Sequence, residues 1–190
     1  MKLLNDRIRK DGKVFPGGVL KVNSFLNHQV DPILMTELAK EFKRIFDGVE
    51  VTKILTAEVS GIAPACFVAK EYGVPLVFAK KSRGTNMAGD VYVEEVFSFT
   101  HNQTYQISVS KDFLSRDDKI LIIDDFLAKG NALACLVKLA RQSGAEVVGC
   151  GTVIEKTFQG GAECVRELGV RVESLAKVTA MTDEAIELEE

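Results

Sequence analysis

Hydrophobic positions along the chain follow two patterns that alternate. Short runs of consecutive apolar residues are typical of strands buried on both faces of a sheet, and apolar residues every three or four positions are typical of amphipathic helices. The first pattern predicts strands at 53–57, 75–79, 120–123, 146–154 and 170–178. The second predicts helices at 1–10, 31–46, 62–72, 133–142 and 161–168. The alternation predicts an α/β fold, in which helices cover both faces of a mainly parallel sheet.

Three segments break this alternation and are expected to be additions to the sheet. Residues 13–22 hold two short β-prone runs around Pro16-Gly17-Gly18, a turn signal. Residues 80–89 are basic, contain glycine and lack hydrophobic periodicity, which predicts a mobile loop. Residues 91–100 and 104–110 are expected to pair as a hairpin on the edge of the sheet.

The chain is expected to form one domain spanning residues 1–190, which is long enough to bury a hydrophobic core. Residues 23–30 show no clear period and are expected to be irregular. The acidic tail, 182–190, is expected to form a short helix.

Composition and charge narrow the classes of function. The hydrophobic fraction is 46%, the charged fraction 27% and the net charge −3, so a general attraction to nucleic acid is not expected. No apolar run approaches the length that spans a membrane, and residues 1–6 turn polar too early for a signal peptide. We therefore expect a cytoplasmic protein that binds neither nucleic acid nor membranes.

The cysteines and histidines offer no pattern of metal ligands. Cys66, Cys135, Cys150 and Cys164 are widely spaced, and no two of them form a Cys-x-x-Cys pair. Each lies among apolar neighbours on an expected helix or strand, which predicts core thiols in a reducing cytosol rather than zinc ligands or disulfides. The two histidines of the chain are too few for a histidine-based metal site.

Residues 119–132 are the most informative stretch for function. The apolar run 120–123 is expected to end at two adjacent, solvated carboxylates, Asp124 and Asp125, before a small-residue turn and a helix. Unpaired amides and a partial positive charge at a helix N-terminus attract phosphate. The carboxylates can accept hydrogen bonds from sugar hydroxyls, or face a magnesium ion held by phosphates. The stretch predicts a sugar-phosphate site, and the alternative is an ordinary strand-to-helix turn.

Residues 122–132, Ile-Ile-Asp-Asp-Phe-Leu-Ala-Lys-Gly-Asn-Ala, resemble the phosphoribosyl diphosphate (PRPP) signature of type I phosphoribosyltransferases. Four further segments are similar to bacterial xanthine-specific members of this family, namely 15–22, 24–32, 58–63 and 153–156. The resemblance implies the type I fold, with a small N-terminal hood over the base at 1–30 and a mobile loop and hairpin flap at 80–110. It also implies transfer of ribose 5-phosphate from PRPP to xanthine, giving XMP and pyrophosphate in purine salvage.

The resemblance implies roles for particular residues. Asp124 and Asp125 would be catalytic, holding the ribose hydroxyls and favouring the positive charge that develops on the sugar. The PRPP-binding residues would be Glu58, Ser60, Gly61, Lys81, Ala128, Lys129, Gly130, Asn131 and Ala132. Lys81 and Arg83 would close over the pyrophosphate and exclude water, unless they belong to a merely solvated basic loop. Mg²⁺ would act as cofactor, held mainly by PRPP and not by a protein metal site.

The phosphate loop departs from the family pattern at one point. Many relatives have Thr-Gly-x-Thr, whose hydroxyls bind phosphate, where this chain has 129–132, Lys-Gly-Asn-Ala. Either Lys129 and Asn131 supply donors in their place, or both side chains point outward and only the backbone binds. Both interpretations stay open at this point.

Choice of the base is expected to depend on three residues. Lys156 has only donors, so it suits an oxo group and disfavours the amino group of adenine. Asn27 can donate and accept beside carbon 2, and Leu20 would add an apolar contact. Phe126 and Phe158 are candidates to stack on the purine. The alternatives are that Lys156 is simply exposed and that Asn27 belongs to a turn near the helix start. The leucine and the two aromatic residues would then pack in the core.

Other functions are compatible with the same motifs. Within the family, the alternatives are an enzyme specific for adenine and an enzyme specific for hypoxanthine and guanine. Outside catalysis, the chain would be a regulator of this fold that senses PRPP and binds nucleic acid, or a nucleotide-binding module without activity. The resemblance also implies a homodimer, with the N-terminal segment or the hairpin contributing to its interface.

Overall fold

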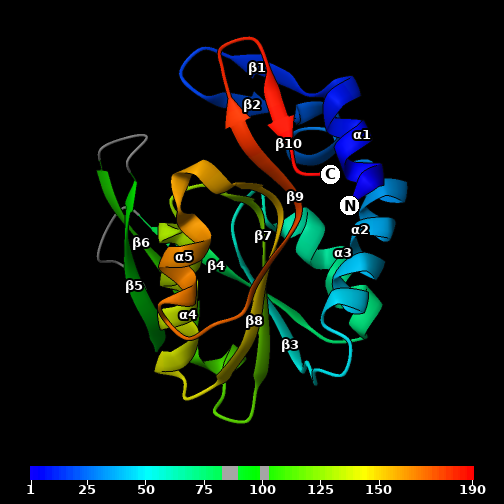
Figure 1. The fold of residues 1–190 in the computed structure, drawn as a ribbon. Coiled ribbons are helices and arrows are strands. Elements are labelled where there is room, and N and C mark those ends of the chain that lie inside the picture. The colour runs from blue at the N-terminus through cyan, green and yellow to red at the C-terminus, as the bar shows by residue number, and fades with distance from the viewer. Residues whose placement is uncertain (83–89, 99–102) are drawn as a thin grey trace.

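An eight-stranded sheet forms the centre of the protein in a computed structural model that describes residues 1–82, 90–98 and 103–190 (Figure 1). From edge to edge the strands are β10 (Ile186–Leu188), β9 (Val172–Met181), β8 (Glu146–Lys156), β7 (Lys119–Leu127), β3 (Lys53–Ala57), β4 (Leu76–Ser82), β6 (Gln103–Ser110) and β5 (Val91–Ser98). Neighbours from β9 to β4 are parallel, whereas β10, β6 and β5 are antiparallel additions. The predicted mainly parallel sheet is confirmed.

Helices cover both faces of the sheet, as the alternating pattern predicts (Figure 1). One hydrophobic core lies between the sheet and three helices, α1 (Lys2–Asp11), α2 (Pro32–Ile45) and α3 (Ile62–Tyr72). A second core lies on the other face beneath α4 (Asn131–Gln142) and α5 (Gly161–Arg166). Two short strands, β1 (Lys13–Phe15) and β2 (Val19–Lys21), form a separate hairpin.

The start of α2 shows how local sequence determines these elements. Asp31 is its N-cap, and the carboxylate oxygen Oδ1 accepts hydrogen bonds from the amides of Ile33 and Leu34, both at 3.1 Å. Pro32 occupies the first helical position, where no amide hydrogen is needed. The predicted start of this helix is confirmed.

The order of the strands reverses between the parallel strands β3 and β7, since the chain continues outward from β3 to β4 and outward from β7 to β8, and the two strands part there. Their pairing ends at Leu55 and Ile122, whereas the pairing of β7 with β8 continues to Leu127. The prediction that the strand ends at the aspartates is therefore wrong, because β8 extends β7 through both of them. The edge of β7 facing β3 opens beyond Ile122, and such a switch point at the carboxyl ends of strands is where α/β sheets bind ligands.

Several other expectations need correction. The tail forms strand β10 rather than a helix, because it pairs with the edge of β9. Residues 23–27 form a turn of π-helix rather than irregular chain. β4 continues through the first part of the expected mobile loop, where Lys80 and Lys81 pair with β6. The rest of that loop, 83–89 with Arg83, and the hairpin connection at 99–102 lie outside the described residues.

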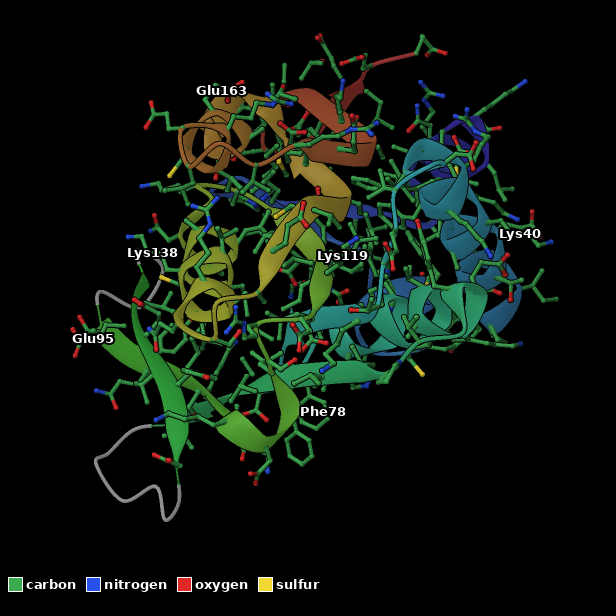
Figure 2. All side chains as sticks on the ribbon, turned by 90° about the horizontal axis from the view of Figure 1, so that it is seen from below. Lys40, Phe78, Glu95, Lys119, Lys138 and Glu163 are labelled. Atoms are coloured by element: carbon green, nitrogen blue, oxygen red, sulfur yellow. The ribbon has the colours of Figure 1, made fainter. Side chains whose placement is uncertain are left out.

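One cysteine lies at the surface against expectation, and several phenylalanine side chains are exposed, among them Phe78 and Phe113. Cys135 and Cys150 are buried as expected, but Cys66 is exposed, so the prediction that every cysteine is a core thiol is wrong. Phe78 of β4 points away from the helices (Figure 2). It is 40% exposed, and Phe113 is 58% exposed. In the described part of the chain, no helix is both long and apolar enough to cross a membrane.

Candidate active site

A cleft lies at the switch point, where the carboxyl ends of β3 and β7 diverge. It consists of two adjoining cavities of about 540 and 200 Å³, which share Val96, Tyr105 and Ala132 in their walls. Every predicted PRPP-binding residue, both aspartates and Lys156 line one cavity or the other. Segments far apart in sequence thus bring the predicted chemistry to one place.

The two aspartates form a closely coupled pair on β7. The Asp124 side chain is only 9% exposed, so the expectation that both carboxylates are solvated is wrong for this residue. Burial, and then the charge of Asp125, raise the pKa of Asp124 well above its usual value. Burial also raises the pKa of Asp125, although hydrogen bonds with Asp124 and Asn27 oppose that rise. Each carboxyl group of the pair therefore ionises less readily than an aspartate in water, unless hydroxyl donors or cations approach it.

The turn after β3 packs directly against this pair. A Cβ atom on Gly61 would lie 2.8 Å from Asp124 Oδ1 and 2.2 Å from Thr56 Oγ1, so the close approach requires glycine. Glu58 Oε1 accepts a hydrogen bond from the backbone amide of Lys81 at 2.8 Å. The turn and β4 are thereby joined, and they form one wall of the smaller cavity.

The loop between β7 and α4 presents backbone amides to the larger cavity. Gly130 is the N-cap of α4 with φ +83°, so no N-cap side chain competes for the amides of the first helical turn. A Cβ atom on Gly130 would lie 2.5 Å from the carbonyl oxygen of Gly161, so the loop packs closely against the start of α5. Lys129 and Asn131 both line the cavity, and their role as phosphate donors stays a prediction.

Lys156, the last residue of β8, brings a positive charge to the larger cavity. Its Nζ donates a hydrogen bond to the carbonyl oxygen of Gly18 at 2.8 Å and lies 5.8 Å from the centre of the Phe126 ring. Burial lowers the pKa of Lys156. Phe126 also lines the cavity, so a lysine and an aromatic ring stand together where a planar ligand can lie.

Leu20, Asn27 and Phe158 lie outside the walls of both cavities. Leu20 is 6% exposed and belongs to the core under α1 and α2, although its neighbour Val19 lines the larger cavity. Asn27 ends the π-helical turn and reaches the site through its hydrogen bond with Asp125. Phe158 is 48% exposed. The proposed contacts of Leu20 and Asn27 with a base stay predictions.

Sequence reasoning missed residues that reach the cleft from other elements. Val96 and Tyr105 are directly paired across the hairpin, and the Tyr105 ring lies 5.4 Å from Lys81 Nζ. Finding that pair requires the register of two strands, which the sequence alone does not give. Gly161 packs against Gly130 from the start of α5 without lining a cavity, and it had a detectable signal, because Gly160-Gly161 stands at the start of an expected helix.

Comparisons with known proteins agree on one family. Residues 22–167 match the family described as phosphoribosyl transferase domain. The xanthine phosphoribosyltransferase of Lachnoclostridium phytofermentans is 56% identical over 184 residues, covering 97% of this chain and 95% of that protein. The protein of the same name from Clostridium novyi is 54% identical over 181 residues, covering 95% of each.

Solved structures share the fold at lower identity. The adenine phosphoribosyltransferase of Giardia lamblia in complex with 9-deazaadenine is similar with a TM-score of 0.79 and 22% identity, covering 93% of this chain and 98% of that one. The adenine enzyme of Rhodothermus marinus has a TM-score of 0.78 and 20% identity, with coverage of 94% and 100%. At this identity the likeness shows the fold alone.

Proposed function

Because this chain belongs to the phosphoribosyltransferase family, we propose that it transfers ribose 5-phosphate from PRPP to xanthine and releases pyrophosphate. The product is XMP, so the reaction is a step of purine salvage. The observation that carries the proposal is one cleft lined by an acidic pair, an uncapped helix N-terminus and a lysine that offers only donors. The relatives named for xanthine support the choice of base.

The phosphoribosyl group would be held between α4 and the acidic pair. Backbone amides of 128–132 would bind the 5-phosphate at the helix N-terminus. Asp124 and Asp125 would accept hydrogen bonds from the ribose hydroxyls, which favour the ionised carboxylates and offset the pKa rise caused by burial. As the bond from the sugar to pyrophosphate breaks, the pair would stabilise the positive charge on the sugar.

The leaving pyrophosphate would occupy the smaller cavity. The turn of Glu58, Ser60 and Gly61 and the ammonium group of Lys81 line it, so amides, a hydroxyl and a positive charge can meet its oxygens. Arg83 follows two residues after Lys81 and belongs to the same proposal. Closure of Lys81 and Arg83 over this cavity would exclude water, which would otherwise hydrolyse PRPP.

The acidic pair fits a magnesium ion that arrives already bound to phosphates. Among the described residues, no three histidine, cysteine, aspartate or glutamate side chains gather as a metal site. Two adjacent carboxylates suit a cation whose other ligands are phosphate oxygens and water. We expect Mg²⁺ to be bound mainly by PRPP, where it would neutralise charge on the leaving pyrophosphate.

Recognition of the base would involve Lys156 and the hood. Lys156 would donate to an oxo group of xanthine and oppose the amino group of adenine, because two donors face each other there. Phe126 would stack on the ring, Asn27 would contact the carbon-2 side, and Leu20 would contribute an apolar contact. The purine nitrogen that attacks the sugar loses its proton as the new bond forms.

Assembly and location complete the proposal. We expect a homodimer, and the exposed Phe78 and Phe113 offer an apolar surface that a second copy would cover, in addition to the hood or the hairpin. Analytical ultracentrifugation measures the assembly directly, and a monomer at micromolar concentration would contradict it. PRPP and XMP are charged metabolites of the cell interior, so we place the protein in the cytoplasm.

The decisive experiment compares four bases with PRPP and Mg²⁺. Pyrophosphate release and the mass of the nucleotide product are measured with xanthine, guanine, hypoxanthine and adenine. We expect xanthine to give the highest kcat/KM and adenine to give none measurable. A preference for adenine would refute the role of Lys156, and PRPP binding without any nucleotide product would refute the proposal of an enzyme.

A further inference from the structure

The hairpin of β1 and β2 needs support from outside itself. Each strand has only three residues, and among the described residues the hairpin pairs with no strand of the main sheet. A two-stranded hairpin of this size is marginally stable alone. Its turn nevertheless lines the larger cavity through Gly17 and Gly18, so its position matters to the site.

The turn itself consists of two glycines with open space where side chains would lie. Gly17 and Gly18 have φ +83° and +73°, the left-handed conformation that glycine adopts readily. Within the described residues, no atom lies within 4 Å of the place that a Cβ atom would take on either glycine. Leu20 and Val14 hold the strands of the hairpin on the core, but the two glycines of the turn add no side-chain contacts, so hydrogen bonds are what position the turn itself.

Two hydrogen bonds tie the turn to the C-terminal half of the chain. Lys156 Nζ donates to the carbonyl oxygen of Gly18 at 2.8 Å, and the amide of Gly17 donates to Asp183 Oδ1 at 3.2 Å. Asp183 lies in the turn between β9 and β10, where Thr182 Oγ1 accepts the amide of Ala185 at 3.0 Å. Figure 1 shows the hairpin and the β9–β10 turn at the same end of the molecule.

We propose that Asp183 is a positioning residue for recognition of the base. It fixes the glycine turn so that the Gly18 carbonyl orients the Lys156 ammonium group within the cavity. The lysine stem is flexible, and an ammonium group without a fixed acceptor would sample several positions. The inference rests on the proposed function, because it assigns Lys156 to the base, and it adds a residue outside both cavities.

Three variants separate positioning from general stability. Asp183→Ala removes the acceptor, Asp183→Asn keeps an oxygen acceptor at the same place, and Glu184→Ala is a matched control on the same turn. Among the described residues, the Glu184 carboxylate has no hydrogen bond or ion pair. KM for xanthine, KM for PRPP and the thermal unfolding midpoint are measured for each.

We expect Asp183→Ala to raise KM for xanthine about three- to fivefold, the effect of losing one exposed hydrogen bond. KM for PRPP and the unfolding midpoint should stay unchanged, and Asp183→Asn and Glu184→Ala should behave as the wild type. In a Lys156→Met background, Asp183→Ala should have no further effect on KM for xanthine, because the lysine that it positions is gone.

Other outcomes overturn the proposal. An unchanged KM for xanthine in Asp183→Ala, an equal rise in both KM values, or a full effect in the Lys156→Met background would each refute it. A wild-type protein that makes no XMP would instead refute the proposed function. The two failures are therefore distinguishable in one set of assays.

Discussion

Replacing Gly130 with alanine should weaken PRPP binding in addition to lowering the stability of the fold. The φ of +83° costs a residue with a side chain about 1–2 kcal/mol. The new Cβ atom would also lie 2.5 Å from the Gly161 carbonyl oxygen, a backbone atom, so the phosphate loop must shift. The loss of one amide hydrogen bond to a phosphate, worth about 1.5–3 kcal/mol, weakens binding about 10- to 150-fold.

Gly160 provides a matched control for this variant. It also has a left-handed φ of +70°, but nothing described lies within 4 Å of the place of its Cβ atom. Gly160→Ala should therefore lose a similar 1–2 kcal/mol of stability, about the cost of the strained backbone alone, and keep its affinity for PRPP. Isothermal titration calorimetry with Mg²⁺ and PRPP measures both affinities, and equal dissociation constants in the two variants would refute the placement of the loop.

Further predictions concern the acidic pair and the lysine. Replacing both Asp124 and Asp125 by asparagine should preserve folding and slow pyrophosphate release about 10²- to 10³-fold, and near-normal turnover would contradict their role. Asp124→Asn alone should raise the unfolding midpoint at pH 7, because burial raises the folded-state pKa of Asp124 above its usual 3.8. The stability contributed by the protonated carboxyl is fully present below pH 3.8 and is lost as pH rises through the folded pKa. The advantage of the variant in thermal unfolding should therefore disappear in acid, and an advantage independent of pH would contradict the buried, raised pKa. Lys156→Met should raise KM for xanthine about 10- to 100-fold, the loss of one charged hydrogen bond, with KM for PRPP unchanged in steady-state assays. A variant with normal KM for xanthine would remove Lys156 from the base site.

The elements that could be predicted well from the sequence are determined by residues close to them in the chain. The N-cap Asp31 followed by Pro32, and the closing glycine Gly73 of α3 in the left-handed conformation, both act within one turn of helix. Buried strands can likewise be recognised in the sequence as apolar runs, so the parallel strands of the sheet were predictable. The loop between β7 and α4 was predictable for the same reason, because strand, small residues and helix follow each other in the chain, and its binding of phosphate stays a prediction.

The elements that escaped prediction depend on partners distant in sequence. β7 runs through Asp124 and Asp125 because β8 continues alongside it, and no periodicity in β7 itself reveals that. The tail becomes a strand only because the edge of β9 is available to it. The burial of Asp124 depends on the turn at Gly61, which packs against it from another strand.

A crystal structure with Mg²⁺ and PRPP tests the central claim most directly. We expect the 5-phosphate within hydrogen-bonding distance of the amides of 128–132, and the ribose hydroxyls on Asp124 and Asp125. A structure in which PRPP leaves those amides empty, with both carboxylates turned away from the sugar, would contradict it.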